Sequence, residues 1–151
     1  MTYIAFSTNR GFASIEDNFV NGFQRVVLVY DCWSSHFKTV CKTHQLCTAH
    51  LTRKLVFFEE RYQSKWATDF INLIHQALEL KKNLTQEEYQ KPTIKRTEIL
   101  LELNILLQTS VPKEQKDLCA FHKRMAKYKD YIFTFLFYYY VPPDNNARNV
   151  Q

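Results

Sequence analysis

The apolar run at residues 26–30, VVLVY, leads directly into Asp31, and it constrains the fold more than any other segment. Apolar side chains at consecutive positions are typical of a strand covered on both faces, as in a parallel sheet. Such a strand would bring the carboxylate of Asp31 to an edge of the sheet. There it could bind a metal ion, or it could cap the following helix by accepting a hydrogen bond from the backbone N–H near Ser34.

The segments around this strand predict an α/β beginning. Residues 2–7 and 45–49 have the composition of two further short strands, residues 13–19 that of a short helix, and residues 33–40 that of a helical crossover. We expect strands 26–30 and 45–49 to pair in parallel, because a helical crossover joins parallel strands.

After residue 51 the apolar residues recur every three or four positions, which predicts helices. Trp66, Phe70 and Ile74 mark one face of the first long helix, residues 94–107 form the second, and Leu118 begins a third that continues through Ile132 into an aromatic segment. We therefore divide the chain into a partial α/β core (1–58), a helical region (59–140) and a short final segment (141–151).

The formal charge of +5 and the pI near 9.0 favour a polyanionic partner without demonstrating one. The basic side chains best placed for phosphate contacts lie on two expected helices: Arg53, Lys54, Lys123, Arg124 and Lys127. Phosphate contacts need only such side chains and confer no sequence specificity. The alternative is that these residues form ordinary solvated helix faces.

The cysteines, at positions 32, 41, 47 and 119, lack the spacing of a disulfide scaffold, which favours a reduced, cytosolic setting. Cys41, His44, Cys47 and His50 recur every three residues. On a helix these four side chains would spread over half of the circumference, and on a strand they would point alternately to opposite faces. Because the ligands of a zinc ion must converge, we do not expect zinc here. The simpler expectation is that Cys47 is a buried thiol and His50 a hydrogen-bonded side chain.

The most apolar stretch, residues 131–141, is too short to span a bilayer, which takes about twenty residues. No signal peptide is expected at the start either, so we predict a cytoplasmic protein that does not insert into membranes. Phe133, Phe135, Leu136 and Phe137 are expected in the core, because no basic residues interrupt them. If they were left uncovered, the chain would self-associate through this apolar surface.

The blocks VYDCWSSHF, HQLCTAHLTRKL and VPPDNNARNV, in this order and spacing, resemble the insertion sequence 66 family of transposases over nearly the whole chain. The resemblance implies a ribonuclease-H-like fold in the bacterial cytoplasm, and cleavage and joining of DNA strands at transposon ends. It also implies Mg²⁺ or Mn²⁺ held by two Asp and one Glu. Asp31 matches the second Asp, as a catalytic and metal-binding residue. Other positions match motif residues of the family: Trp33, Cys47, His50, Asp144, Asn145 and Asn146.

Two departures from the family pattern carry expectations of their own. The family's first Asp lies upstream of the part resembling residues 2–12, where this chain has only Met1. Against the family pattern, about five residues, among them the Glu of the Glu-Arg that follows the Asn pair, are deleted between Ala147 and Arg148. We therefore expect an incomplete ribonuclease-H-like sheet and a truncated or decayed transposase that is inactive alone and binds no stable metal pair. The alternative is a non-catalytic helical interaction or DNA-binding module in which Asp31 is merely a cap.

Overall fold

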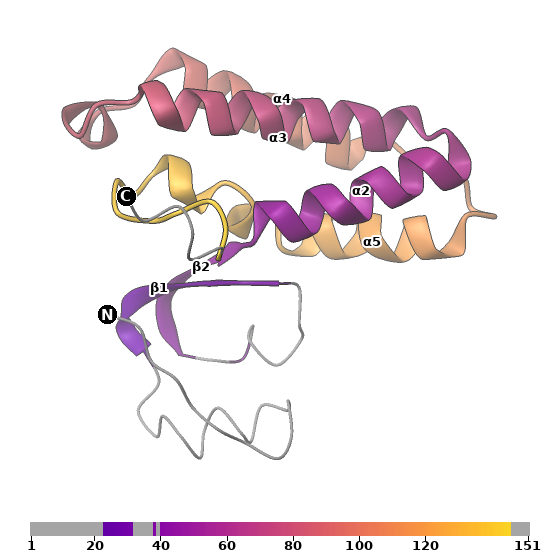
Figure 1. Cartoon of the computed structure of the whole chain (residues 1–151), viewed down its shortest axis with the longest axis horizontal. Coiled ribbons are helices and arrows are strands. Elements are labelled where there is room, and N and C mark those ends of the chain that lie inside the picture. Colours follow the sequence, from indigo (N-terminus) through magenta and orange to yellow (C-terminus); the bar gives the residue numbers. More distant parts are fainter. Residues whose placement is uncertain (1–22, 32–37, 39, 146–151) are drawn as a thin grey trace.

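The computed structural model describes residues 23–31, 38 and 40–145, and over these the chain forms two strands followed by four α-helices (Figure 1). The elements are β1 (Phe23–Tyr30), β2 (Cys41–Leu46), α2 (Thr48–Tyr62), α3 (Lys65–Asn83), α4 (Ile94–Gln108) and α5 (Lys116–Lys127), with short 3₁₀ turns η2 (Glu87–Gln90), η3 (Lys129–Tyr131) and η4 (Thr134–Leu136). The predicted fold class, α/β with a mainly helical remainder, is confirmed. The strand predicted at 2–7, the helix at 13–19 and most of the crossover at 33–40 lie outside the described residues.

The parallel pairing of the two strands is confirmed, but the predicted bounds of the second strand are wrong. It begins at Cys41 and ends at Leu46, which lies opposite Tyr30 in the register. The backbone N–H of Cys47 donates to the carbonyl oxygen of Tyr30 at 2.7 Å, whereas that of Thr48 donates to Pro143 at 3.0 Å. The chain therefore leaves the sheet at position 47, and α2 starts where the sequence predicted strand.

The helices pack around a common apolar core, with α3 between α2 and α4. On α2 the buried apolar residues recur at helical spacing as Leu51, Leu55 and Phe58. The predicted face of the first long helix, Trp66, Phe70 and Ile74, is buried in α3. Apolar burial of this kind is the main stabilising term for helices of these lengths.

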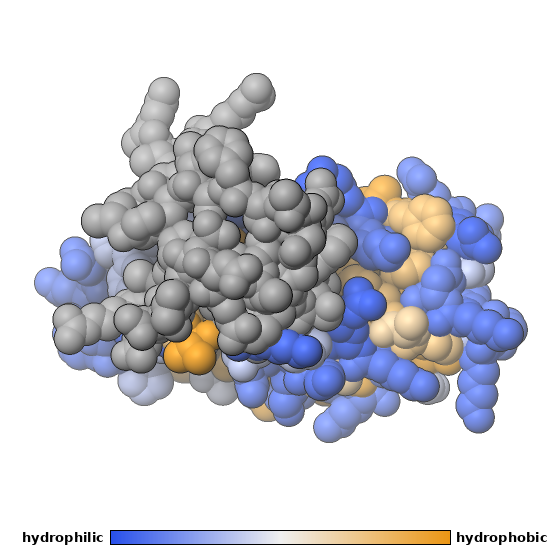
Figure 2. Space-filling view, turned by 90° about the horizontal axis from the view of Figure 1, so that it is seen from below, coloured by the Kyte–Doolittle hydropathy of each residue, from blue (hydrophilic) through white to orange (hydrophobic). Residues whose placement is uncertain are grey.

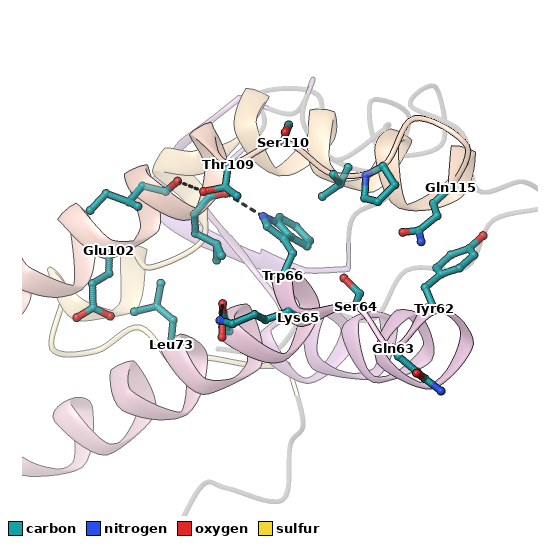
Figure 3. A pocket seen from close by; sticks show the side chains of 15 residues that line it. Tyr62, Gln63, Ser64, Lys65, Trp66, Leu73, Glu102, Thr109, Ser110 and Gln115 are labelled. Atoms are coloured by element: carbon teal, nitrogen blue, oxygen red, sulfur yellow. Dashed lines mark hydrogen bonds and ion pairs between the residues drawn. The ribbon is translucent and has the colours of Figure 1, made fainter.

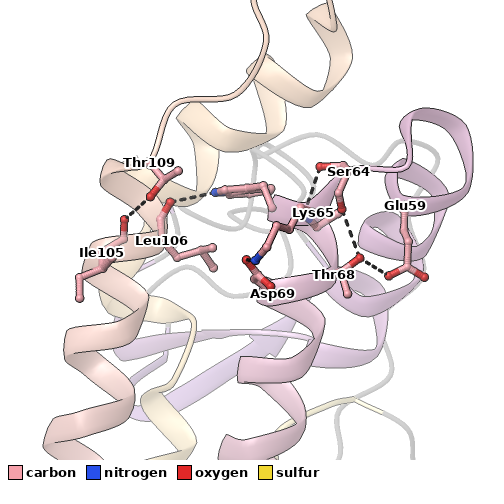
Figure 4. Close-up of polar contacts among 10 residues, drawn as sticks. Glu59, Ser64, Lys65, Thr68, Asp69, Ile105, Leu106 and Thr109 are labelled. Atoms are coloured by element: carbon pink, nitrogen blue, oxygen red, sulfur yellow. Dashed lines mark hydrogen bonds and ion pairs between the residues drawn. The ribbon is translucent and has the colours of Figure 1, made fainter.

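The bend between α2 and α3 takes only two residues. Gln63 ends α2 in the left-handed region at φ 50°, and Ser64 accepts a hydrogen bond from the N–H of Ala67 at 3.2 Å as the N-cap of α3 (Figure 4). The hydroxyl of Thr68 then donates to the carboxylate of Glu59 at 2.6 Å. This bend sets α3 back against α2 in an antiparallel helical hairpin.

The expected continuous helix from Leu118 into the aromatic segment is wrong, because α5 ends at Lys127 and two 3₁₀ turns follow. Polar groups of β2 hold these turns: the buried amide of Gln45 donates to the carbonyl oxygen of Ile132 at 2.7 Å and accepts from the N–H of Phe135 at 2.8 Å. A continued helix would use those backbone groups within itself. The turn also leaves Phe137 exposed instead of in the core, whereas the other three predicted core residues of this segment are buried.

Among the described residues, no helix combines the length and apolar character that crossing a bilayer requires.

Candidate functional site

The carboxyl ends of β1 and β2 meet at one edge of the sheet, as parallel strands require. Asp31 follows β1 directly, and β2 continues through Cys47 into the first turn of α2, which carries His50. The Nε2 atom of His50 lies 3.9 Å from Oδ2 of Asp31, and both side chains are partly exposed. Nδ1 of His50 is buried without a hydrogen-bond partner in the described part of the chain. Within the described residues, the edge therefore presents the carboxylate of Asp31 and the imidazole of His50 to solvent.

The end of the described chain is fastened to the same edge. The thiol of Cys47, buried as expected, donates to Oδ1 of Asn145 at 3.2 Å, next to the bond between Thr48 and Pro143. Asp144 belongs to the same turn and is partly buried. Motif residues from three distant parts of the sequence are thus neighbours in space. Trp33 and Asn146 lie outside the described residues.

A buried polar layer behind the edge holds this arrangement. The hydroxyl of Thr134 donates to the carbonyl oxygen of His44 at 2.6 Å, beside the bonds made by Gln45. The hydroxyl of Tyr30 lies 2.7 Å from Nδ1 of His44, so this imidazole is engaged within the core. These contacts fix the chain segment that leads from α5 to the turn at Asn145.

Residues 1–149 match the family model described as "Transposase IS66 family". The chain belongs to the IS66 family of transposases. No curated protein and no solved structure matches it. Membership of this family connects the chain with transposition of insertion sequences and with DNA as the partner. The resemblance inferred from the three sequence blocks is thereby confirmed.

The family is one of DDE transposases, which in general use divalent metal ions, so the side chains at the Asp31 edge can be examined as metal ligands. The described residues contain no group of three or more His, Cys, Asp or Glu side chains placed to hold a metal ion. Magnesium prefers several oxygen ligands, and two closely spaced ions need several carboxylates to offset their charge. Asp31 with His50 nearby does not fit a two-metal site. The Cys and His residues that recur every three positions from Cys41 to His50 have different partners. The thiol of Cys41 contacts the imidazole of His44, whereas the thiol of Cys47 donates to Asn145.

The basic residues predicted to contact DNA all lie on exposed helix surface. Arg53 and Lys54 are on α2, about one turn beyond His50, so they continue outward from the edge. The other three, Lys123, Arg124 and Lys127, are on α5. Their role in DNA binding stays a prediction for this IS66 chain.

A cavity of about 620 Å³, which no sequence pattern indicated, lies between the α2–α3 bend and the C-terminal end of α4 (Figure 3). Trp66 projects into it and donates from Nε1 to the carbonyl oxygen of Leu106 at 2.8 Å. Oε1 of Gln115, in the opposite wall, is buried without a partner in the described part of the chain. None of the predicted site residues lines this cavity, so it is separate from the Asp31 edge.

Proposed function

We propose that this IS66 family chain binds the DNA ends of its insertion sequence and that, acting alone, it does not cut or join them. The observation that carries the proposal is the composition of the edge: in the part of the chain that the structure describes, the carboxylate of Asp31 has an imidazole 3.9 Å away, and no three metal-binding side chains gather there. Binding needs only basic surface, whereas strand chemistry needs the full ligand set. The two activities can therefore be separated in this chain.

The proposal assigns Asp31 the place of the family's second Asp, at the carboxyl end of β1. In a complete family member, two divalent ions would activate the attacking oxygen and stabilise the leaving oxygen of one phosphate. The Glu-Arg pair that follows the Asn pair in the family pattern is missing here, since Ala147 is followed directly by Arg148 and Asn149. Asn145 and Cys47 would then preserve the architecture around a site whose ligand set is incomplete.

The test uses the full chain and a labelled duplex that carries the element ends, with Mg²⁺ or Mn²⁺ present. We expect a shifted complex on a native gel and no cleaved or joined strands on a denaturing gel. Asp31→Asn should bind the duplex as the wild type does, like the control Asp69→Asn, which removes an exposed acid paired with Lys65. Metal-dependent products that vanish in Asp31→Asn would overturn the claim of inactivity. Absence of any complex would overturn the DNA-binding role.

A further inference from the structure

One face of α2 carries every basic residue of that helix together with an exposed aromatic ring. At 100° per residue, positions 50, 53, 54, 57 and 61 fall within a stripe about 100° wide. Its members are His50, Arg53, Lys54, Phe57 and Arg61. The stripe begins at the Asp31 edge and extends about 16 Å along the helix at 1.5 Å per residue.

Phe57 lies between two cations on this stripe. The side chain is 42% exposed, and the Nζ atom of Lys54 and the Cζ atom of Arg61 lie 5.7 and 5.8 Å from its ring centroid. Both cations also approach a second ring, Phe58 for the lysine and Tyr62 for the arginine. A large apolar side chain is thus held at the surface in a cationic setting.

The acidic residues of α2 leave the stripe clear. Glu59 lies on the opposite side and accepts the hydroxyl hydrogen bond of Thr68 at 2.6 Å. Glu60 is exposed and flanks the stripe, about 80° from His50 around the helix. None of the five stripe residues is acidic, and the carboxylates described next to them lie at its two ends: Asp31 is 3.9 Å from His50, and Asp117, which accepts from Tyr62, interacts electrostatically with Arg61.

Helix α5 extends this basic surface. It runs antiparallel to α2, with the hydroxyl of Tyr62 donating to Asp117 at 2.6 Å and the rings of Phe58 and Phe121 5.4 Å apart (Figure 1). Arg124 and Lys127, both exposed, follow one and two turns further along α5. In the view from below, the part of the surface that is coloured by hydropathy is mostly hydrophilic, with hydrophobic patches in between (Figure 2).

We propose that this surface, the α2 stripe with the neighbouring end of α5, binds unpaired DNA, with a base stacked on Phe57 and phosphates on Lys54, Arg61 and Arg124. An aromatic side chain between cations can bind single strands, because stacking holds the base while the basic groups hold the backbone. The contacts of Lys54 and Arg61 to the ring are weak at such an exposed site, so phosphates can draw the cations away and uncover it. A closed duplex offers no base face to Phe57. The inference rests on the proposed function and specifies the DNA form that lies next to the Asp31 edge.

The test measures the fluorescence anisotropy of a labelled single strand and of the corresponding duplex on titration with the full chain. Phe57→Leu should weaken single-strand binding about ten-fold and change duplex binding less than about two-fold. The matched control is Phe137→Leu, a ring that is 43% exposed and also faces a cation, with Arg96 at 5.5 Å. It should change neither affinity. Circular dichroism establishes that both variants are folded.

Arg61→Gln supplies a second readout, since losing one phosphate contact should weaken both DNA forms and reduce the salt slope by about one. Equal effects of Phe57→Leu on both DNA forms, or no effect on either, would overturn the stacking role. Wild-type binding to duplex alone would overturn the inference and leave the proposed function standing. Binding to neither form would remove both.

Discussion

The thiol of Cys47 donates to Oδ1 of Asn145 at 3.2 Å, although 98 positions separate the two residues in the sequence. This contact and the bond from Thr48 to Pro143 tie the end of the described chain to the start of α2. The helical part of the molecule is therefore closed back onto the strand edge that carries Asp31. Motif residues that are scattered in the sequence become a single structural unit.

Replacing Asn145 should open this closure. We expect Asn145→Ala to lower the free energy of unfolding by about 0.5–1 kcal/mol, since a thiol is a weak donor. The buried Cys47 should then react faster with a thiol reagent, measured by mass spectrometry of the Cys47 peptide. The control is Asn83→Ala, which removes an exposed hydrogen bond from the side-chain amide to the carbonyl oxygen of Glu79 and should leave that rate unchanged. An unchanged rate in Asn145→Ala would show that the contact does not shield the thiol.

The amide of Gln45 should contribute more to stability than any exposed glutamine. Gln45→Leu would leave the carbonyl of Ile132 and the N–H of Phe135 buried without partners, which costs about 2–4 kcal/mol. Urea unfolding measures this loss, and near-ultraviolet circular dichroism should report altered packing of the aromatic segment. Gln108→Leu, at an exposed position, serves as the control. A change below about 0.5 kcal/mol would mean that the turns do not depend on β2.

Lys81 should make stability depend on pH in the alkaline range. Its ammonium group donates to backbone carbonyls of Phe135, Tyr138 and Tyr139 and to the hydroxyl of Tyr89, and burial lowers its pKa from 10.5 to about 8. Between these values the unfolded chain binds a proton that the folded chain has released, so stability rises with pH.

The measurement is urea unfolding of wild type and Lys81→Met at pH 7.5 and 9.5. Subtracting the stability of the variant from that of the wild type removes the contribution of the other groups that titrate in this range. One of these groups is Tyr89, whose pKa is raised by burial. The wild type should gain stability relative to the variant at the higher pH. A relative loss would show that the carbonyl contacts favour the charged lysine more than burial disfavours it.

Local patterns in the sequence predicted the parts of this fold that depend on local physics. The consecutive apolar residues before Asp31 predicted β1, because they are typical of a strand covered on both faces, and the helical spacing around Phe70 predicted α3, because it buries one face of a helix. The bounds of β2 and the end of α5 were missed for a common reason. Gln45 is polar yet fully buried, and its partners lie about 90 positions later, so no local signal indicates that they meet.

In the candidate site, too, the features that depend on local sequence were predicted and those that depend on other elements were not. The strand-end position of Asp31 was predicted from its neighbours, whereas its proximity to His50 depends on the abrupt start of α2 after Cys47. The exposed Phe57 was not predicted as a site residue, because its cationic setting arises only from helix geometry. The division of the chain at residues 58 and 59 stays a prediction.

The central claim is that the described residues at the Asp31 edge do not form the set of carboxylates that the family's chemistry needs. Its most direct test is a Mn²⁺ titration of the full chain followed by calorimetry and by paramagnetic broadening of NMR signals. We predict at most one ion, bound with a dissociation constant of about 1 mM or weaker, broadening that is centred on Asp31 and His50, and its loss in Asp31→Asn. Two ions bound with micromolar dissociation constants would contradict the account.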